Sequence, residues 1–433
     1  MLNFFNLFQP DWKSVSIAFL SAKFMFESYL KLRQHNILSR TVAPSSSNEE
    51  LDQESFEKRQ EYSRVKSKYK LIADTLKYFR DLFIIQSNLN SIIWTVSGGI
   101  LTNSNFLPQT ELSQSLIFCT VSKILLFTWK LPFDLYYNFV IEEEFNFNKS
   151  TVPDLLISSF IQEFVQWVID LTIISSFIKL IQYFGRIPIF HLTAVVWLVF
   201  TMGFAIYPRI ILPLLLKVNP LPEGELRSKI EKLAEDKSFR LNKISAIDGS
   251  SSTAHTNALA AGSPWSGTIA IYDNFSDHLS IDEVVSVAAH ELGHLKLFHL
   301  EQQSIYLSII VGSKLLFISK FIENKSLYEQ FGLPGGTTPF LIGYLIAQDI
   351  YIPLEVLGTF IDNYLKRKIE TDADYYSAID CGFKETTASA LSKHLKMNLS
   401  TVSSDWLYSL YFETHPSAIT RLEALNVAIR KHS

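Results

Sequence analysis

The segment from His290 to His294 reads His-Glu-Leu-Gly-His and sets two imidazole groups four residues apart, with a carboxylate between them. On a helix of 3.6 residues per turn the two histidines lie about 40° apart and can reach one metal ion. Glu291 lies one step round the helix, where its carboxylate can reach a water molecule at the metal. This pattern is typical of a catalytic zinc site with Glu291 as the general base.

The residues before the motif predict that it lies inside a helix. Ser280 and Glu283 have the spacing of a capping box, in which each side chain accepts a backbone N–H at the start of a helix. A helix that starts there continues through His294.

The composition indicates a membrane protein. The chain has 433 residues, 48% of them hydrophobic and 19% charged, with 33 Phe and a mean hydropathy of +0.15. A net charge of −4 gives no basic excess, so nucleic acid is not expected as a partner. Cys119 lies in an apolar run and Cys381 stands alone, which excludes a disulfide framework and a cysteine zinc site.

Apolar stretches predict about seven transmembrane helices. They cover residues 13–32, 82–102, 115–137, 155–182, 189–216, 303–323 and 338–362. Because the residues before the first stretch lack a basic segment and a cleavage site, we expect a retained anchor there. The polar residues 41–70 are typical of a mobile loop or a solvated helix.

The Lys and Arg residues orient these helices. The segment from Lys31 to Arg80 is rich in both, whereas residues 103–114 have none and residues 324–338 have only Lys325. By the positive-inside rule, loop 33–80 is expected in the cytosol and the N-terminus in the lumen. We therefore divide the chain into a membrane domain, a catalytic region, a membrane hairpin and a cytosolic C-terminal region with the third zinc ligand. Their bounds are 1–216 (spans one to five), 217–302, 303–362 and 363–433.

Charged side chains within or beside the apolar stretches must avoid lipid. They are Lys23, Glu27, Lys123, Lys130, Asp134, Glu163, Asp170, Lys179, Arg209, Lys314, Asp349 and Glu355. They can pair between helices or line a hydrated cavity, and their number favours the cavity. The expected fold is an all-α multi-pass membrane protein whose helices enclose a hydrated chamber, with a cytosol-facing, gluzincin-like α+β zinc metalloprotease domain.

A catalytic zinc needs a third protein ligand. His299 is rejected, because the extended motif would need Gly at 297 and His at 300, where this chain has Leu. Glu370 and Asp374 lie one turn apart, after the last apolar stretch, and in isolation they would indicate a solvated acidic face. Their pairing with the His290–His294 helix across a membrane hairpin favours Glu370 as the ligand and Asp374 as its support.

Several motifs together resemble the type I CAAX prenyl protease family, the seven-pass zinc endopeptidases that process fungal mating pheromone and animal prelamin. The motifs are His290–His294, Glu370–Asp374, Asp248–Ala258, His415–Leu422, Glu142–Lys149 and Glu223–Leu226. Two departures are Lys366 where the family usually has Ser, and Asn146 where it usually has Gly. Neither removes a metal ligand.

The resemblance implies a role for each matching residue. It implies zinc ligands at His290, His294 and Glu370, the base at Glu291, and a carboxylate at Asp374 that orients a ligating histidine. His415 is expected to donate to the oxyanion and Arg421 to hold the carboxylates. His255, Asn257 and Ala258 are implied in substrate binding. The residues alone show only that 257–262 is an apolar strand that ends in Gly and can bind an extended peptide by strand addition.

The implied activity is removal of the last three residues after a prenylated cysteine, with a second, upstream cleavage also expected. We further expect one Zn²⁺ per chain and farnesylated CAAX proteins or peptides as substrates. The protein is expected to be a monomer in the lipid bilayer of the endoplasmic reticulum membrane. General membrane-protein quality control and an inactive scaffold for prenylated tails are the alternatives. The seven spans argue against the first, and the intact residues from His290 to His294, with Glu370, argue against the second.

The predicted orientation is tested by the Asn-x-Ser sequons. Asn148, Asn274 and Asn398 should face the cytosol and stay unmodified in cells, whereas Asn324 should be lumenal. The measurement is a glycosidase-sensitive mobility shift. Glycosylation at Asn274 would invert the topology, while its absence at Asn324 would not, since that site lies near the membrane.

Overall fold

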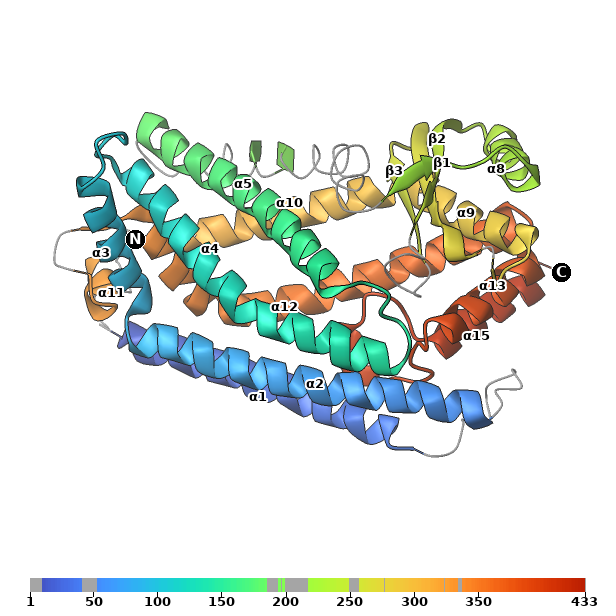
Figure 1. Ribbon diagram of the computed structural model, residues 1–433, viewed down its shortest axis with the longest axis horizontal. Helices are drawn as coiled ribbons and strands as arrows, with labels where there is room; N and C mark the ends of the chain where they lie inside the picture. Colours follow the sequence, from blue (N-terminus) through green and yellow to red (C-terminus); the bar gives the residue numbers. More distant parts are fainter. Residues whose placement is uncertain are drawn as a thin grey trace.

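The computed structural model describes residues 10–40, 53–184, 194–195, 197–198, 217–248, 257–275, 277–322, 324–333 and 337–432. Figure 1 shows an elongated molecule in which long helices run along the long axis. The N-terminus and two short helices, α3 and α11, lie at one end, and a small sheet with α9 lies at the other.

The predicted apolar stretches coincide with long helices, with two exceptions. The long helices are α1 (Trp12–Leu38), α2 (Gln53–Gln86), α4 (Glu111–Tyr136), α5 (Val152–Phe184), α10 (His299–Ile318) and α12 (Phe340–Tyr375), and the short ones at the far end are α3 (Leu89–Thr102) and α11 (Lys325–Gln330). By length and composition alone, three described helices can cross a membrane: Glu111–Glu142, Val152–Tyr183 and Phe340–Asp380. The stretch 189–216 falls almost wholly outside the described residues.

The second predicted span, 82–102, is wrong as a single helix. The chain breaks after Gln86, and Asn88 has a φ of 56°, a left-handed conformation that Asn tolerates better than most residues. The Lys13 ammonium fixes the break by donating to the Gln86 carbonyl and to Asn88 Oδ1, both at 2.9 Å.

Helix α2 also replaces most of the predicted loop 33–80. It packs along α1, where Lys31 pairs with Asp74 at 2.7 Å and the Ser21 and Tyr78 hydroxyls are 3.0 Å apart. Of the two forms expected for residues 41–70, the helix is therefore found from Gln53 onward. Residues 41–52 lie outside the described part of the chain.

The charges near the apolar stretches face one another, as predicted. Lys123 and Lys130 of α4 reach Glu163 of α5 at 2.8 and 3.0 Å, and Lys23 of α1 reaches Glu355 of α12 at 2.9 Å. The last pair also lines a cavity of about 330 Å³ between α1, α2 and α12. Interhelical pairing and internal cavities therefore occur together. Arg209 lies outside the described residues.

Three of the segments predicted to be lumenal, the N-terminal one and those at 103–114 and 324–338, share one end of the molecule. The Trp12 N–H donates to Gln330 of α11 at 2.6 Å, and the Phe340 N–H donates to Glu111 at 2.8 Å. The starts of α1, α4 and α12 are therefore close together. The catalytic elements lie at the opposite end (Figure 1).

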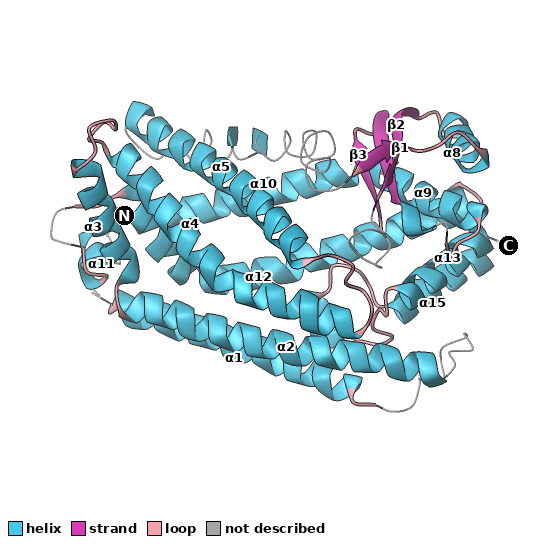
Figure 2. Cartoon of the chain, in the orientation of Figure 1, coloured by secondary structure: helices cyan, strands magenta, loops and turns pink. Residues whose placement is uncertain are grey.

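The catalytic end contains a four-stranded sheet covered by helices (Figure 2). Its elements are β1 (Val218–Pro220), α8 (Glu225–Asp236), β2 (Arg240–Ile247), β3 (Ala258–Gly262), β4 (Ser266–Tyr272), α9 (Ile281–Lys296), α13 (Lys384–Met397), α14 (Trp406–Phe412) and α15 (Ala418–Lys431). The strand order is β1-β2-β4-β3, with β3 antiparallel to β4, so β3 is an edge strand as predicted. Ile269 and Ile271 of β4 pack against Val284 and Leu292 of α9, and this apolar core fixes the motif helix on the sheet.

Helix α12 crosses the predicted boundary at residues 362 and 363 without interruption. Its first half carries the apolar stretch and its last turns carry Glu370 and Asp374. A short π-helical turn, Tyr376–Asp380, follows directly. The position of Glu370 is therefore set by a helix that is anchored among the other long helices.

Candidate metalloprotease active site

Helix α9 begins as predicted and is anchored at its start. Ser280 and Glu283 form a complete capping box. The Glu283 carboxylate also accepts from Ser389 at 2.6 Å and pairs with Lys393 at 2.8 Å, both on α13. Although burial opposes ionisation, these bonds lower the pKa of Glu283 to about 2, so the anchor keeps its charge at neutral pH. The start of α9 is therefore fixed against α13, at the end of the helix opposite to its histidines.

Three side chains converge where the sequence predicts a metal. The Nε2 atoms of His290 and His294 are 3.1 Å apart, and Glu370 oxygens lie 3.5 and 3.7 Å from them. A tetrahedral ion with bonds of 2.0–2.1 Å needs donor separations of about 3.3 Å. The three residues form a group able to hold a metal ion, and the donor set of two imidazoles and one carboxylate fits it.

A carboxylate and a guanidinium support this group from behind. His290 Nδ1 lies 3.0 Å from Asp374, which turns Nε2 toward the other two donors. Arg421 of α15 donates two hydrogen bonds to Asp374, at 2.8 and 2.7 Å, and its Nη2 lies 3.8 Å from Glu370. The structure thus brings together the predicted support residues Asp374 and Arg421 with the predicted ligands.

The site requires a positive charge at its centre. Burial lowers the pKa of His290, but hydrogen bonds to Asp374 and Glu370 outweigh it and raise the pKa to about 10. Burial and the neighbouring His290 lower the pKa of His294 to about 3, so that this imidazole stays neutral, as a metal ligand must be. Two carboxylates therefore attract one cation, either a proton on His290 or a metal ion.

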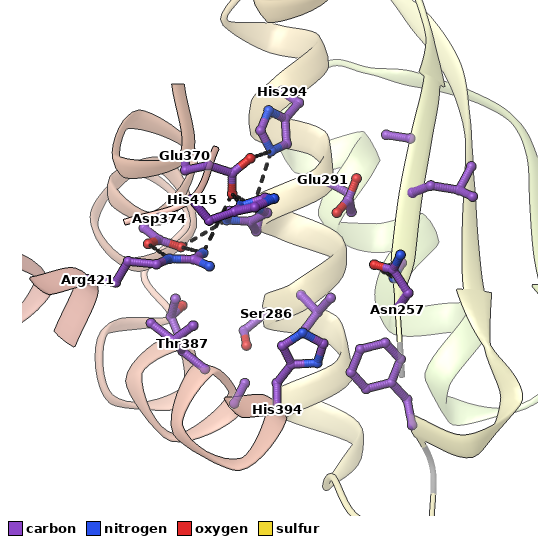
Figure 3. A pocket seen from close by; sticks show the side chains of 18 of the residues that line it. Asn257, Ser286, Glu291, His294, Glu370, Asp374, Thr387, His394, His415 and Arg421 are labelled. Carbon is purple, nitrogen blue, oxygen red and sulfur yellow. Dashed lines mark hydrogen bonds and ion pairs between the residues drawn. The ribbon is translucent and has the colours of Figure 1, made fainter. Parts of the chain in front are cut away.

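Glu291 lies beside the three metal-binding side chains, on the side that faces the sheet (Figure 3). Burial raises the pKa of its carboxyl group above the usual value, although the His290 charge opposes this. A carboxylate with a raised pKa takes up a proton more readily near neutral pH, which suits a general base.

His299 does not belong to the group of three donors, and its position differs from the one that the motif spacing gave. α9 ends at Lys296 and Phe298 takes a left-handed φ of 61°, so His299 begins a new helix instead of lying further round α9. This turn brings His299 Nδ1 to 3.1 Å from His294 Nδ1. His299 is buried and orients His294, a contact that helical spacing could not reveal.

His415 lies in the loop between α14 and α15, with Nδ1 3.0 Å from Glu370 and 61% of its side chain exposed. It therefore borders the site from the open side. Its predicted role as oxyanion donor stays a prediction.

A cavity of about 400 Å³ opens in front of the three donors. Asn257 and Ala258, both predicted to bind substrate, line it, whereas His255 lies outside the described residues. It is also lined by Ser286, Thr387 and His394, which the sequence did not predict. His394 stacks on Phe275, and nothing in the local sequence marks its position, because α13 reaches the cavity only through tertiary packing.

The register of β3 places backbone groups on the cavity side. The Tyr272 N–H donates to the Asn257 carbonyl at 3.0 Å, which makes these two residues a hydrogen-bonded pair. In an antiparallel ladder such pairs alternate, so the N–H and C=O groups of Ala258 and Ala260 point away from β4. Both alanines line the cavity, and their backbone groups can pair with an extended peptide.

A helical membrane domain, an HExxH helix and a glutamate on a second helix together define a membrane metallopeptidase. Residues 34–217 match the family described as CAAX prenyl protease N-terminal, five membrane helices, and residues 220–429 match peptidase family M48. The chain belongs to this family of CAAX prenyl proteases.

Relatives match over almost the whole chain. CAAX prenyl protease 1 of Saccharomyces cerevisiae is 33% identical over 97% of this chain and 96% of its own length, and an Arabidopsis thaliana homologue is 33% identical over 95% and 96%. The crystal structure of Saccharomyces mikatae Ste24p superposes with a TM-score of 0.90 at 31% identity, covering 96% of this chain and 99% of that one. These findings confirm the predicted family, fold class and metallopeptidase activity.

Substitutions at Glu370 and Glu291 separate metal binding from proton transfer. Because Glu370 supplies a charged donor, Glu370→Ala should lose tightly bound metal, whereas Glu291→Gln should keep it and lose turnover. Metal content by elemental analysis and peptide cleavage are measured on both purified variants. Equal metal in Glu370→Ala and wild type would remove Glu370 from the ligand set.

Proposed function

We propose that this chain is a zinc endopeptidase that removes the last three residues of farnesylated CAAX proteins after the prenylated cysteine, and that it also cuts an upstream site. The observation that carries the proposal is a metal-binding group beside an outward-facing edge strand, at the end of a helical membrane protein. The names of its relatives, CAAX prenyl protease 1 and Ste24p, support the substrate class.

Zinc is the metal that suits the donor set. Two imidazole nitrogens and one carboxylate oxygen are the ligands of known catalytic zinc sites, which keep a fourth position open. His290, His294 and Glu370 would hold the ion. When bound, zinc supplies a Lewis acid that activates water for attack on a peptide carbonyl.

The protein groups perform the remaining steps. Ala258 and Ala260 bind the peptide main chain and fix its register. Glu291 accepts a proton from the attacking water and passes it to the leaving amine. His415 stabilises the oxyanion, and Arg421 keeps Asp374 and Glu370 in place.

The membrane domain suits a substrate that consists of a farnesyl chain and a peptide. A farnesyl chain gains roughly 0.8 kcal/mol for each CH₂ that is buried in an apolar setting, whereas the peptide and the reaction require water. The charged cavities between the helices provide the wet environment. We place the enzyme in the endoplasmic reticulum membrane as a monomer, with its active site toward the cytosol, the side on which loop 33–80 is expected.

Matched peptides test this proposal. Purified protein is incubated with a farnesylated CAAX peptide and its unfarnesylated counterpart, and the cleaved bonds are mapped by mass spectrometry, with Glu291→Gln as the inactive control. We expect cleavage after the farnesylated cysteine and slower cleavage of the unfarnesylated peptide. Equal, unspecific cleavage of both would indicate a quality-control protease, and binding without cleavage would indicate a scaffold.

Proline at position 260 tests strand addition. Because the Ala260 N–H points away from β4, Ala260→Pro leaves the ladder with β4 intact but removes a bond to the substrate, together with the contact of this N–H with the Glu291 carboxylate. We expect a 10- to 100-fold loss of kcat/KM, roughly 1.4 to 2.7 kcal/mol of transition-state stabilisation, and a milder effect from Ala260→Val. Metal content confirms that the site still folds. Wild-type cleavage by the proline variant with full metal would place the peptide elsewhere.

A further inference from the structure

A second and larger cavity, of about 700 Å³, adjoins the active-site cavity. The two share Asn257, His394, His415 and Arg421, so one continues into the other. The second cavity is walled by α1, α2, α13 and the loops around α14. The mechanism above assigns this cavity only a wet environment and gives no role to the lysines that line it.

Two lysines of α2 face this cavity without a carboxylate partner. Within the described part of the chain, neither Lys66 nor Lys70 has an ion pair within 4.0 Å. The Lys66 ammonium donates to the Tyr62 hydroxyl at 3.2 Å, and the Lys70 ammonium lies 5.1 Å from the centre of the Phe412 ring. Aromatic groups therefore position both ammonium groups, while Glu142 acts on Lys66, and Asp74 and Glu27 act on Lys70, only at longer range.

The other charges of the wall are already engaged. Arg421 is bound to Asp374, and among the described residues the single carboxylate lining this cavity is Glu413, which accepts from Ser404 through one oxygen and offsets one of the two lysine charges. Lys31, on the neighbouring helix, is paired with Asp74. The cavity therefore has a net positive charge, and its ligand should carry a negative one.

The geometry of β3 decides which end of a substrate reaches the lysines. Asn257, at the start of the strand, lines both cavities, whereas the far end of β3 lines neither. A peptide added antiparallel to β3 runs from Gly262 toward Asn257, so its C-terminus points into the second cavity.

A short tail can pass from the first cavity into the second, because the two share lining residues. Three extended residues span about 10 Å. On the protein side, Phe412 and His415 are three residues apart and therefore at most about 11 Å from each other. The Phe412 ring lies under Lys70 and His415 contacts Glu370. A tail that continues past Asn257 thus enters the cavity that the two lysines line.

We propose that Lys66 and Lys70 bind the free α-carboxylate at the C-terminus of the substrate and thereby measure the three-residue tail. This inference rests on the proposed function. An ammonium–carboxylate contact is charge-assisted, and two of them select a chain end over an internal segment that lacks the charge. The site thus gives an endopeptidase a preference for a terminal tripeptide.

The test compares two farnesylated peptides that differ only in a C-terminal carboxylate or a C-terminal amide. The double variant Lys66→Met/Lys70→Met is compared with wild type and with Lys68→Met, a matched control on the same helix whose side chain is exposed and does not line the cavity. The quantity is the ratio of kcat/KM for the two peptides. Because both are measured on one preparation, this ratio is independent of the fraction of folded enzyme.

Wild type and Lys68→Met should prefer the carboxylate about 10-fold, the scale of a charge-assisted hydrogen bond. The double variant should lose this preference by cleaving the carboxylate peptide more slowly and the amide peptide unchanged. Equal cleavage of both peptides by wild type, or a preference retained in the double variant, would overturn the subsite. The assay is repeated in detergent micelles with and without phosphatidylserine. If the double variant changes only the effect of this lipid on cleavage, the lysines bind lipid headgroups and the subsite is also overturned. Wild type that cleaves neither peptide would refute the proposed function itself.

Discussion

The carboxylate of Asp374 joins three helices at one point. It receives both hydrogen bonds of Arg421 from α15 and one from His290 of α9, while it belongs to α12. Breaking a buried, bidentate pair of this kind costs about 3–5 kcal/mol, because it leaves a charge without a partner. Glu370 lies one turn before Asp374 on the same helix, so the contact that orients His290 also sets the position of Glu370.

This arrangement couples the site to the membrane domain. α12 continues from the apolar region to Asp374, and Lys23 of α1 holds it by pairing with Glu355. Arg367 further along α12 donates to the Ser409 and Glu413 carbonyls, which fixes the loop that leads to His415. A shift of α12 would therefore move a metal donor, its support and a cavity wall together.

The sequence could predict what local patterns determine. The capping box at Ser280 and the HExxH helix follow from periodicity and caps, the edge position of 258–262 follows from the family resemblance, and all three are found. The break at Asn88 was missed, because the apolar run continues across it and only tertiary contacts from Lys13 hold the turn. His299 and His394 were missed as site residues for a related reason: each reaches the site through a turn or a helix packing that no residue spacing records.

The edge strand explains how a protease with an open backbone ladder avoids unwanted pairing. Unpaired N–H and C=O groups at a sheet edge attract any exposed strand. Here β3 is five residues long, and its free edge faces a cavity that α9 and α13 also line. A folded protein cannot bring a strand into that space, whereas an extended, flexible tail can. The edge is therefore shielded from aggregation and open to the kind of segment that ends a lipidated protein.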